Sequence, residues 1–418
     1  MSDSSREYDL VVFGANGYTG RYTAEHVTTH LPTDLKWAVA GRSTFKLEAL
    51  ISDLKALNPD RAPPSIEVAE LSKASLHALA AKTRVLISTV GPYSKYGTGV
   101  VEACAANGTH YLDVTAESPW VYEMIRAYDG IAKKNHAIMI PQIGIESAPA
   151  DLLTWSLATH ARRTLNAGLG EVVYSLHDLK GAPSGGTLAS VLGLFEQYSL
   201  GQVAESTKPW SMCPVPPPAQ DRQPHKKTLF EKLLGVREVS GLGVLTTSIQ
   251  GTPDSTIVHR SWGLLGGGEY YGERFQFSPY MRARNVFTGV LMHVSLIVGV
   301  LALLLPPVRW LLRNFVYQPG QGTGREIASR DRIEYRAIAT TDSTDPVDPK
   351  KISGRLAWDG SLYYLTGVFL AEAAITLLRD ESLAKKIGGG FLTPATLGGS
   401  FVERLQKAGL KVDVRVMP

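Results

Sequence analysis

Short apolar runs alternate with amphipathic stretches through the first third of the chain. The runs are rich in Val, Ile and Leu, which predicts buried strands. We expect these strands at 8–15, 36–43, 66–71, 84–93, 109–117 and 136–146. Between them, apolar residues recur at helical spacing, which predicts helices at 17–31, 45–57, 73–83, 97–108 and 118–135. This alternation predicts an α/β domain with a doubly wound, mainly parallel sheet.

A second, smaller α/β domain is predicted from the pattern beyond residue 150. Strand-like sequences occur at 171–181, at 325–341 and within 243–262, where a Gly-Thr-Pro-Asp turn is expected to join paired strands. The stretch at 184–198 has two interpretations: its first residues form a functional turn, or they open a helix. We expect a core helix at 362–380, and a helix followed by a strand at 398–416. Residues 207–228 hold six prolines and predict a mobile or lid-like excursion.

Residues 286–308 form the most apolar stretch of the chain, and they carry no formal charge. As a helix this stretch is long enough to cross a bilayer. It could instead embed in one leaflet and bend back at Pro306–Pro307, or form a buried core or dimer helix. Both flanks are expected in one domain, which favours embedding in one leaflet. Polar and interfacial residues at its ends are expected at head-group level: Arg282, Arg284, Arg309, Arg313 and Trp310.

Three glycines follow the first predicted strand at a spacing of three: Gly14, Gly17 and Gly20. A glycine-rich turn between a strand and a helix lets the backbone approach a pyrophosphate, and the helix N-terminus supplies N–H groups and a partial positive charge. This context predicts a Rossmann-type dinucleotide-binding domain at 1–150 and a substrate and association domain at 151–418. The expected cofactor contacts in this turn are Gly14, Asn16, Gly17, Tyr18, Thr19 and Gly20.

The end of the second predicted strand indicates which dinucleotide binds. NAD sites usually place an acidic residue there for the ribose hydroxyls, but this chain has Gly41, Arg42 and Ser43. A guanidinium binds a 2′-phosphate through charge-assisted hydrogen bonds, whereas a carboxylate repels it. We therefore expect NADP rather than NAD, with Arg42 and Ser43 at the 2′-phosphate. The alternative is that Arg42 is a solvated surface residue.

Candidate catalytic side chains follow the fourth, fifth and sixth predicted strands, where ligands of such sheets bind. Gly91 and Pro92 are expected beside the nicotinamide, with Tyr93 and Lys95 as candidate proton donors. The loop could instead only cradle the cofactor through its backbone. Later loops add Asp113, Thr115, Glu117, Glu146, Ser147 and Asp151, of which Asp113 and Glu146 are the catalytic candidates. None of these residue types fixes the proton donor by itself.

Composition excludes several other classes of function. The net charge is +4 and no basic tract carries interleaved aromatics, so nucleic acid is not an expected partner. Cys104 and Cys213 are the two cysteines, which predicts neither a disulfide framework nor a metal site and indicates a reducing compartment. The seven residues before the first strand are polar and leave no room for a secretory signal, so the protein is expected to face the cytosol and not to be secreted.

Several segments occur in an order that resembles the saccharopine dehydrogenase-like oxidoreductases, a group that includes the trans-acting enoyl reductases of lipid biosynthesis. They are GANGYTG, AGRS, STVGPYSKYG, YLDVTAE, IGIESAPADL, SGGT, PGQGTG and TPATLGGSFVERLQKAGLKV. The resemblance spans nearly the whole chain and implies a dinucleotide domain joined to a smaller α/β domain, with NADP-linked reduction. It differs at Ala116, where members often have Gly, and at Gln321, where the family has an acid.

The expected function is NADP-dependent reduction of an enoyl or carbonyl group in a lipophilic fatty or polyketide chain at a membrane or lipid surface. A cytosol-facing lipid droplet or endomembrane would suit the apolar segment, and a homodimer is compatible with it. Two alternatives stay open. One is a lipid-surface protein that binds dinucleotide without turnover. The other is a saccharopine-type amino-acid dehydrogenase, which would need a cationic site for substrate carboxylates.

Overall fold

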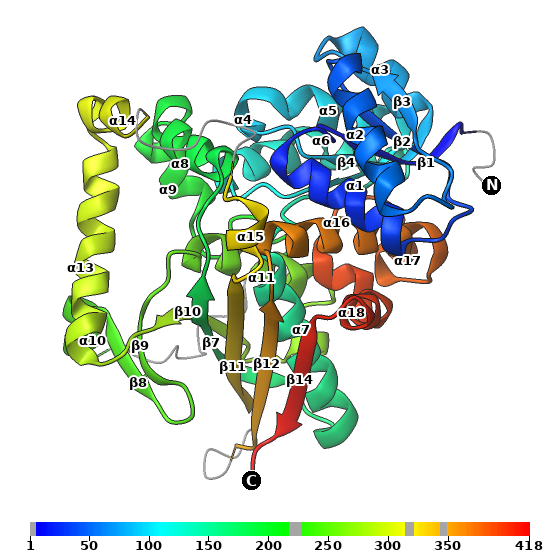
Figure 1. Ribbon diagram of the computed structural model, residues 1–418. Helices are drawn as coiled ribbons and strands as arrows, with labels where there is room; N and C mark the ends of the chain where they lie inside the picture. The colour runs from blue at the N-terminus through cyan, green and yellow to red at the C-terminus, as the bar shows by residue number, and fades with distance from the viewer. Residues whose placement is uncertain (1–5, 217–227, 314–321, 343–348) are drawn as a thin grey trace.

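Two seven-stranded sheets make up the core of the molecule (Figure 1). The computed structural model describes residues 6–216, 228–313, 322–342 and 349–418. The first sheet is parallel throughout, in the order β13-β6-β5-β4-β1-β2-β3. Its strands are β1 (Tyr8–Phe13), β2 (Trp37–Gly41), β3 (Ser65–Val68), β4 (Thr83–Ser88), β5 (His110–Asp113), β6 (Ile138–Ile140) and β13 (Gly390–Phe391). The predicted doubly wound α/β fold is confirmed.

Helices cover this first sheet in the alternating order that the sequence predicts. They are α1 (Tyr18–His30), α2 (Thr44–Leu57), α3 (Lys73–Ala81), α4 (Tyr93–Tyr96), α5 (Thr98–Asn107) and α6 (Ser118–Lys134). Strand β1 lies between β2 and β4, and its residues Leu10, Val11 and Val12 are fully buried. The chain order reverses between β1 and β4, and a crevice at such a switch point is where doubly wound sheets bind ligands.

The second sheet is mixed and has the order β14-β12-β11-β7-β10-β9-β8. Its strands are β7 (Leu169–Lys180), β8 (Val236–Val239), β9 (Gly243–Thr247), β10 (Gln276–Arg282), β11 (Arg332–Thr341), β12 (Lys351–Asp359) and β14 (Lys411–Val416). The remaining helices are α7 (Ala148–Leu165), α8 (Gly185–Gln197), α9 (Leu200–Ser206), α10 (Leu229–Leu234), α11 (Gly251–Leu264), α12 (Gly268–Tyr271), α13 (Val286–Leu303), α14 (Pro306–Arg313), α15 (Arg325–Ala328), α16 (Leu362–Arg379), α17 (Leu383–Ile387) and α18 (Gly398–Lys407), with a 3₁₀ turn at Pro394–Leu397.

A late part of the chain, before the last strand, returns to the first sheet. Strand β13 pairs with β6, and helix α16 packs along α1 on the face of that sheet. Helix α16 is apolar and almost wholly buried, as predicted for a core helix. A division at residue 150 stays a prediction, but the structure shows that residues far beyond it complete the first sheet.

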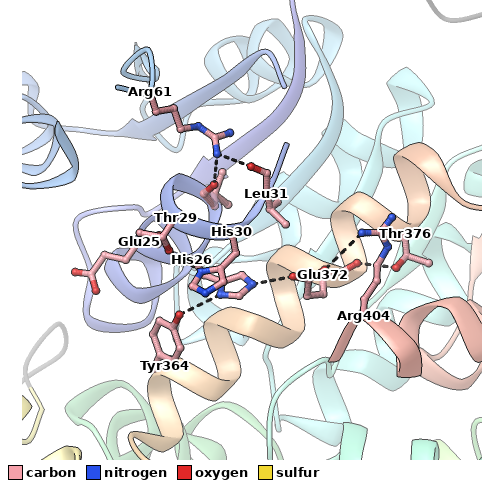
Figure 2. Close-up of polar contacts among 11 residues, drawn as sticks. Glu25, His26, Thr29, His30, Leu31, Arg61, Tyr364, Glu372, Thr376 and Arg404 are labelled. Carbon is pink, nitrogen blue, oxygen red and sulfur yellow. Dashed lines mark hydrogen bonds and ion pairs between the residues drawn. The ribbon is translucent and has the colours of Figure 1, made fainter. Parts of the chain in front are cut away.

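Polar side chains join α1 to α16 inside this contact (Figure 2). The Nε2 atom of His26 lies 2.8 Å from a carboxylate oxygen of Glu372, and its Nδ1 lies 3.2 Å from the Tyr364 hydroxyl. His26 and Glu372 are both buried, and Arg404 of α18 approaches the second Glu372 oxygen at 3.9 Å. Buried polar groups cost free energy unless they are paired, so these contacts fix how the two helices meet.

The paired strands predicted within 243–262 are wrong in part. Strand β9 pairs with the earlier β8 and with β10, while Gly251–Leu264 forms helix α11. Pro253 lies in the first turn of this helix, where its missing N–H is tolerated, and Asp254 is favourable near the helix N-terminus. The buried residues Ile257, Val258 and Trp262 then lie on the helical face toward the core, which outweighs the turn signal.

The predicted lid at 207–228 is also partly wrong. Residues 217–227 lie outside the described residues, but the stretch before them packs on the body of the protein. Trp210 stacks on His259 with ring centroids 3.9 Å apart, and Met212 is buried and accepts a hydrogen bond from Arg260. Aromatic stacking and side-chain hydrogen bonds to the backbone hold a proline-rich segment that has little secondary structure of its own.

The apolar segment 286–308 forms α13 and the start of α14, with the bend at Pro306–Pro307 as predicted. The described residues include two helices that are apolar and long enough to cross a membrane; α16 is the buried core helix, and α13 is exposed. Only Gly289 of α13 is buried, so the core-helix alternative is wrong for this chain. Figure 1 shows α13 standing at the edge of the molecule, with α14 turned back toward α8. Arg309 is also not at a head-group position: it is buried and caps α13 by donating to the carbonyls of Leu303 and Leu304.

Candidate active site

The glycine turn after β1 has a backbone that side chains would block. Gly14 has φ +84°, a left-handed conformation that favours glycine. A Cβ atom at Gly20 would collide with the Gly14 carbonyl oxygen and would lie 2.7 Å from Thr89 Oγ1. Thr89 itself donates to the carbonyls of Phe13 and Gly14 at 3.1 Å, which ties the loop after β4 to the glycine turn. The two loops therefore form one rigid floor at the switch point.

The residues of this turn fit a dinucleotide. Helix α1 begins after Gly17 with no side chain capping its first N–H groups, so these donors are available to a pyrophosphate. Arg42 follows β2 and is exposed; within the described part of the chain it has no ion-pair partner. Ser43 caps α2, accepting from the Lys46 N–H at 3.4 Å. A bound NADP would thus meet backbone donors at its pyrophosphate and a guanidinium at the expected 2′-phosphate position.

A cavity lies above this floor, between the first sheet and helices α8 and α16. The glycine turn, the ends of β4, β5 and β6, and the two helices all contribute to its wall: Gly17, Tyr18, Thr19, Thr89, Gly91, Tyr93, Val114, Thr115, Ala116, Glu117, Glu146, Ser184, Thr187, Ser190, Val191, Leu194, Tyr363 and Thr366. The glycine turn and the helices α8 and α16 therefore line one cavity. A substrate bound in this cavity would face the nicotinamide of a bound cofactor.

The four catalytic candidates do not share one place. Glu146 and Tyr93 line the cavity, whereas Lys95 and Asp113 do not. Lys95 is exposed and its ammonium lies 5.1 Å from the Tyr96 ring centroid. The Tyr93 hydroxyl is turned away into the protein, where it donates to the Ser88 carbonyl at 3.0 Å. Burial raises the pKa of the Glu146 carboxyl, which favours its neutral form.

Asp113 has a structural position at the end of β5. One of its oxygens accepts from the backbone N–H groups of Thr115 and Gln142, at 3.0 and 2.9 Å, and the other accepts from the Tyr111 hydroxyl. Burial raises its pKa from 3.8 to about 7. Asp151 is likewise buried, and it accepts from the Ala395 N–H at 2.8 Å. Both carboxyls hold loops together, and neither reaches the cavity.

Glu117 fixes the loop that carries Gly91 and Pro92. Its two carboxylate oxygens accept from the backbone N–H groups of Tyr93 and Ser94, at 2.8 and 3.0 Å, and Ser190 of α8 donates to it at 2.7 Å. These hydrogen bonds hold the loop after β4 in place, and its role as a backbone cradle for the cofactor stays a prediction. Through Ser190, Glu117 also connects this loop to α8, so the loop fixes the position of this helix.

Sequence reasoning did not find Tyr363, Thr366 or Ser190. Tyr363 and Thr366 lie near the start of α16, which its apolar composition marks only as a core helix. The available signal was a pair of tyrosines in the first turn of an otherwise apolar helix, preceded by the capping residue Ser361. The helix alternative for the stretch from residue 184 is confirmed, since Ser184 Oγ accepts from the Thr187 N–H at the start of α8; Ser184 also lines the cavity, and a role of this turn toward a substrate stays a prediction.

Comparisons with known proteins agree with this architecture. Residues 10–140 match the family described as saccharopine dehydrogenase NADP binding domain. A Mycobacterium tuberculosis protein provisionally named a trans-acting enoyl reductase is 33% identical, and the alignment covers 99% of each chain. A trans-acting enoyl reductase of Mycobacterium bovis is 28% identical over 98% of each chain. The solved structure of saccharopine dehydrogenase (L-Glu forming) from Saccharomyces cerevisiae shares the fold, with TM-score 0.53, 12% identity and coverage of 98% of this chain and 99% of that chain.

Proposed function

Because this chain belongs to the trans-acting enoyl reductase family of NADP-binding oxidoreductases, we propose that it reduces an enoyl or carbonyl group of a lipophilic fatty or polyketide chain. The observation that carries the proposal is the cavity in which the glycine turn, the loops after β4 and β5, and helices α8 and α16 meet. When bound, NADPH supplies the hydride, and the chain's own residues orient the substrate and provide the proton.

The polarity of the cavity supports a lipophilic substrate over an amino acid. Among the described residues that line it, there are two carboxylates, Glu117 and Glu146, and no Lys or Arg. A saccharopine-type substrate carries several carboxylates, and the described lining offers no cation to pair with them. Val191 and Leu194 of α8 instead give one wall an apolar surface. Val191 is also 47% exposed, so this wall reaches the outside of the protein, where an acyl chain could extend.

A membrane or lipid surface as the site of action is supported by α13 and α14. The two helices and the turn between them carry apolar residues that are each more than half exposed: Phe287, Leu291, Val298, Leu301, Leu305 and Trp310. Strands β10 and β11, before and after the segment, both pair with β7. Both ends of the segment thus return to one sheet, which favours insertion into one leaflet over a full span.

The apolar surface also lies near the cavity wall. Helix α14 contacts α8, and Arg309 of α14 lies 3.7 Å from Glu196 of α8. In this arrangement a lipid taken from a monolayer at α13 and α14 would have a short path along α8 to the cofactor floor. The proposal therefore assigns one function to two features of the molecule, the dinucleotide site and the exposed apolar helix α13.

The test measures NADPH oxidation by the purified protein with crotonyl and hexadecenoyl thioesters, with and without phosphatidylcholine vesicles. We expect the long-chain thioester to be reduced faster than the short one, with a further increase on vesicles. Protein that binds NADPH but reduces neither thioester would favour the non-catalytic alternative. Keto thioesters in the same assay distinguish carbonyl from enoyl reduction.

A further inference from the structure

A group of hydroxyls lines the cavity on the side of α8 and α16. Tyr363, the second residue of α16, is half-buried there, and its hydroxyl oxygen has two neighbours from the start of α8. The Ser184 backbone N–H donates to this oxygen at 2.5 Å, and Thr187 Oγ1 lies 2.9 Å from it. Tyr363 carries a phenol, which is a stronger acid than the aliphatic hydroxyls of Ser184 and Thr187.

These contacts suit a hydroxyl that gives up its proton. When Thr187 donates as well as Ser184, both lone pairs of the Tyr363 oxygen accept, and its own hydrogen is left for a ligand in the cavity. The same two donors would stabilise the phenolate that remains after proton transfer. The pKa of Tyr363 is raised by burial and by the nearby Glu146, so the hydroxyl carries its proton at neutral pH.

The ring of Tyr363 is fixed relative to the glycine turn. Its centroid lies 4.9 Å from that of Tyr18, in an edge-on arrangement, and the Tyr18 hydroxyl donates to the Thr323 carbonyl at 2.7 Å. Tyr18 is the first residue of α1, directly after the turn expected to hold the pyrophosphate. The phenol therefore keeps a set position above the cofactor floor, which general acid catalysis requires.

We propose that Tyr363 is the catalytic acid of the reduction, positioned by Ser184 and Thr187. The assignment rests on the proposed function. In an α,β-unsaturated thioester, hydride adds at Cβ, the C=C electron pair moves toward Cα and the carbonyl oxygen, and the Tyr363 O–H bond breaks to deliver its proton to Cα. The phenolate then recovers a proton from water through the Thr187 hydroxyl. Nicotinamide is oxidised and the alkene is reduced, so atoms and electrons balance.

Glu146 is the strongest competitor, because it lines the same cavity. Among the described residues, however, its carboxyl has no hydrogen bond to another side chain, and its own backbone N–H is the one donor to it, whereas the Tyr363 oxygen has two neighbours from the start of α8. A catalytic acid needs both orientation and stabilisation of its conjugate base. Tyr93, Lys95 and Asp113 are turned away from the cavity or lie outside it, as described above.

The test compares Tyr363→Phe with Tyr364→Phe, because the two residues are neighbours on α16 and the Tyr364 hydroxyl contacts His26 and not the cavity. Tyr363→Phe should lower kcat for hexadecenoyl thioester by about 100-fold or more, with KM within about twofold. Thr187→Val should lower kcat by about tenfold, since one donor to the phenolate is lost. Tyr364→Phe should keep kcat within about twofold. NADPH affinity, measured by fluorescence titration, should match wild type in all three variants.

The outcomes separate this proposal from the one it rests on. A wild type that reduces no thioester overturns the proposed function and removes the premise of this assignment. An active wild type with an equally active Tyr363→Phe variant overturns the role of Tyr363 alone. A Tyr363→Phe variant that loses NADPH affinity and kcat together indicates a structural role and also overturns the assignment. If Glu146→Gln is the inactive variant instead, Glu146 is the proton donor.

Discussion

At the scale of single residues, the position of an acid at the end of a strand decides whether its carboxyl lines the cavity or holds a loop in place. Asp113 ends β5 and Glu146 follows β6, two neighbouring parallel strands, and both acids are expected near the cofactor. Only Glu146 reaches the cavity, because the backbone N–H groups of Thr115 and Gln142 capture the Asp113 carboxyl. Two backbone donors to one oxygen hold that side chain in the protein interior, where its ionisation is costly.

The raised pKa of Asp113 gives a pH dependence to stability. Its pKa is about 7 in the folded state, against an ordinary value of 3.8, so between these values the folded protein keeps a proton that the unfolded chain has lost. This group's contribution is therefore fully present below about pH 4 and falls as the pH rises to about 7, by about 4 kcal/mol in all. Asp113→Asn removes this titration while its amide oxygen can still accept both N–H groups. In urea unfolding, the free energy of unfolding of the variant minus that of wild type should rise from about pH 4 to about pH 7. A difference that is constant with pH would contradict the interpretation.

Arg42 is the residue on which cofactor preference is expected to depend. Arg42→Asp places a carboxylate where the 2′-phosphate of NADPH is expected, so repulsion replaces a charge-assisted hydrogen bond. The dissociation constant for NADPH should rise by about 100-fold, whereas that for NADH should change by less than about threefold. Fluorescence titration with both nucleotides measures this, and NADH is the internal control. Equal weakening of both nucleotides would remove Arg42 from the 2′-phosphate site.

At the scale of elements, the contact between α1 and α16 connects the cofactor turn to the proposed catalytic tyrosine. Gly367 lies where the two helices touch, and a Cβ atom there would lie 2.8 Å from the Thr23 backbone nitrogen and 2.9 Å from the Tyr22 carbonyl carbon. Backbone atoms cannot move aside as a flexible side chain can. The close approach of the helices thus depends on a missing side chain, and the His26–Glu372 pair fixes their register (Figure 2).

Gly367→Ala should force α1 and α16 apart. We expect it to lower the free energy of unfolding by about 2 kcal/mol, as overpacking of a close contact does, and to weaken NADPH binding because α1 begins at the glycine turn. Gly130→Ala is the matched control: Gly130 lies inside α6, and an added Cβ would meet nothing within 4 Å. That variant should be up to about 1 kcal/mol more stable than wild type, since alanine favours the helix. Equal stability of the two variants in urea unfolding would contradict the packing argument.

At the scale of the whole molecule, α13 has one side on the second sheet and an exposed apolar surface on its other sides. One side of the helix docks on β9, where Thr246 donates to the Gly289 carbonyl at 2.8 Å and Thr247 Oγ1 lies 2.8 Å from His293 Nδ1. The other sides carry large apolar residues that are exposed, among them Phe287, Leu291 and Val298. Exposed apolar surfaces are typical of sites that contact a membrane or another protein, and the proposed function assigns this one to lipid.

Charges on this surface should release the protein from lipid. Leu291 and Val298 are 56% and 57% exposed, so replacing both by Glu leaves the core unchanged. We expect the double variant to lose phosphatidylcholine-vesicle binding by about tenfold or more in flotation assays, because two apolar contacts are replaced by charges that must stay in water. Val68→Glu, a change at an exposed valine of edge strand β3, is the control and should bind as wild type does. The lipid anchor is wrong if the double variant still floats with vesicles or if wild type never does. If the substitutions instead convert a dimeric wild type into a monomer, the apolar surface binds a second copy of the chain.

Much of the fold follows from local patterns that the sequence carries directly. The apolar run at Leu10–Val12 with glycines after it specifies β1, its turn and α1, because these features act within a few residues of one another. The bend at Pro306–Pro307 is similarly local. The turn signal at Gly251–Asp254 failed because burial of Ile257 and Trp262 is decided by distant parts of the chain.

The sequence by itself therefore determined the parallel first sheet, the glycine turn with its NADP preference, and the existence of an apolar stretch able to meet lipid. Only the tertiary structure decided which side chains share the cavity, because Glu146, Thr187 and Tyr363 come from segments more than 30 residues apart. It also decided that α16 is core and α13 is surface, although both are apolar, since burial depends on which other elements cover a helix and not on its composition.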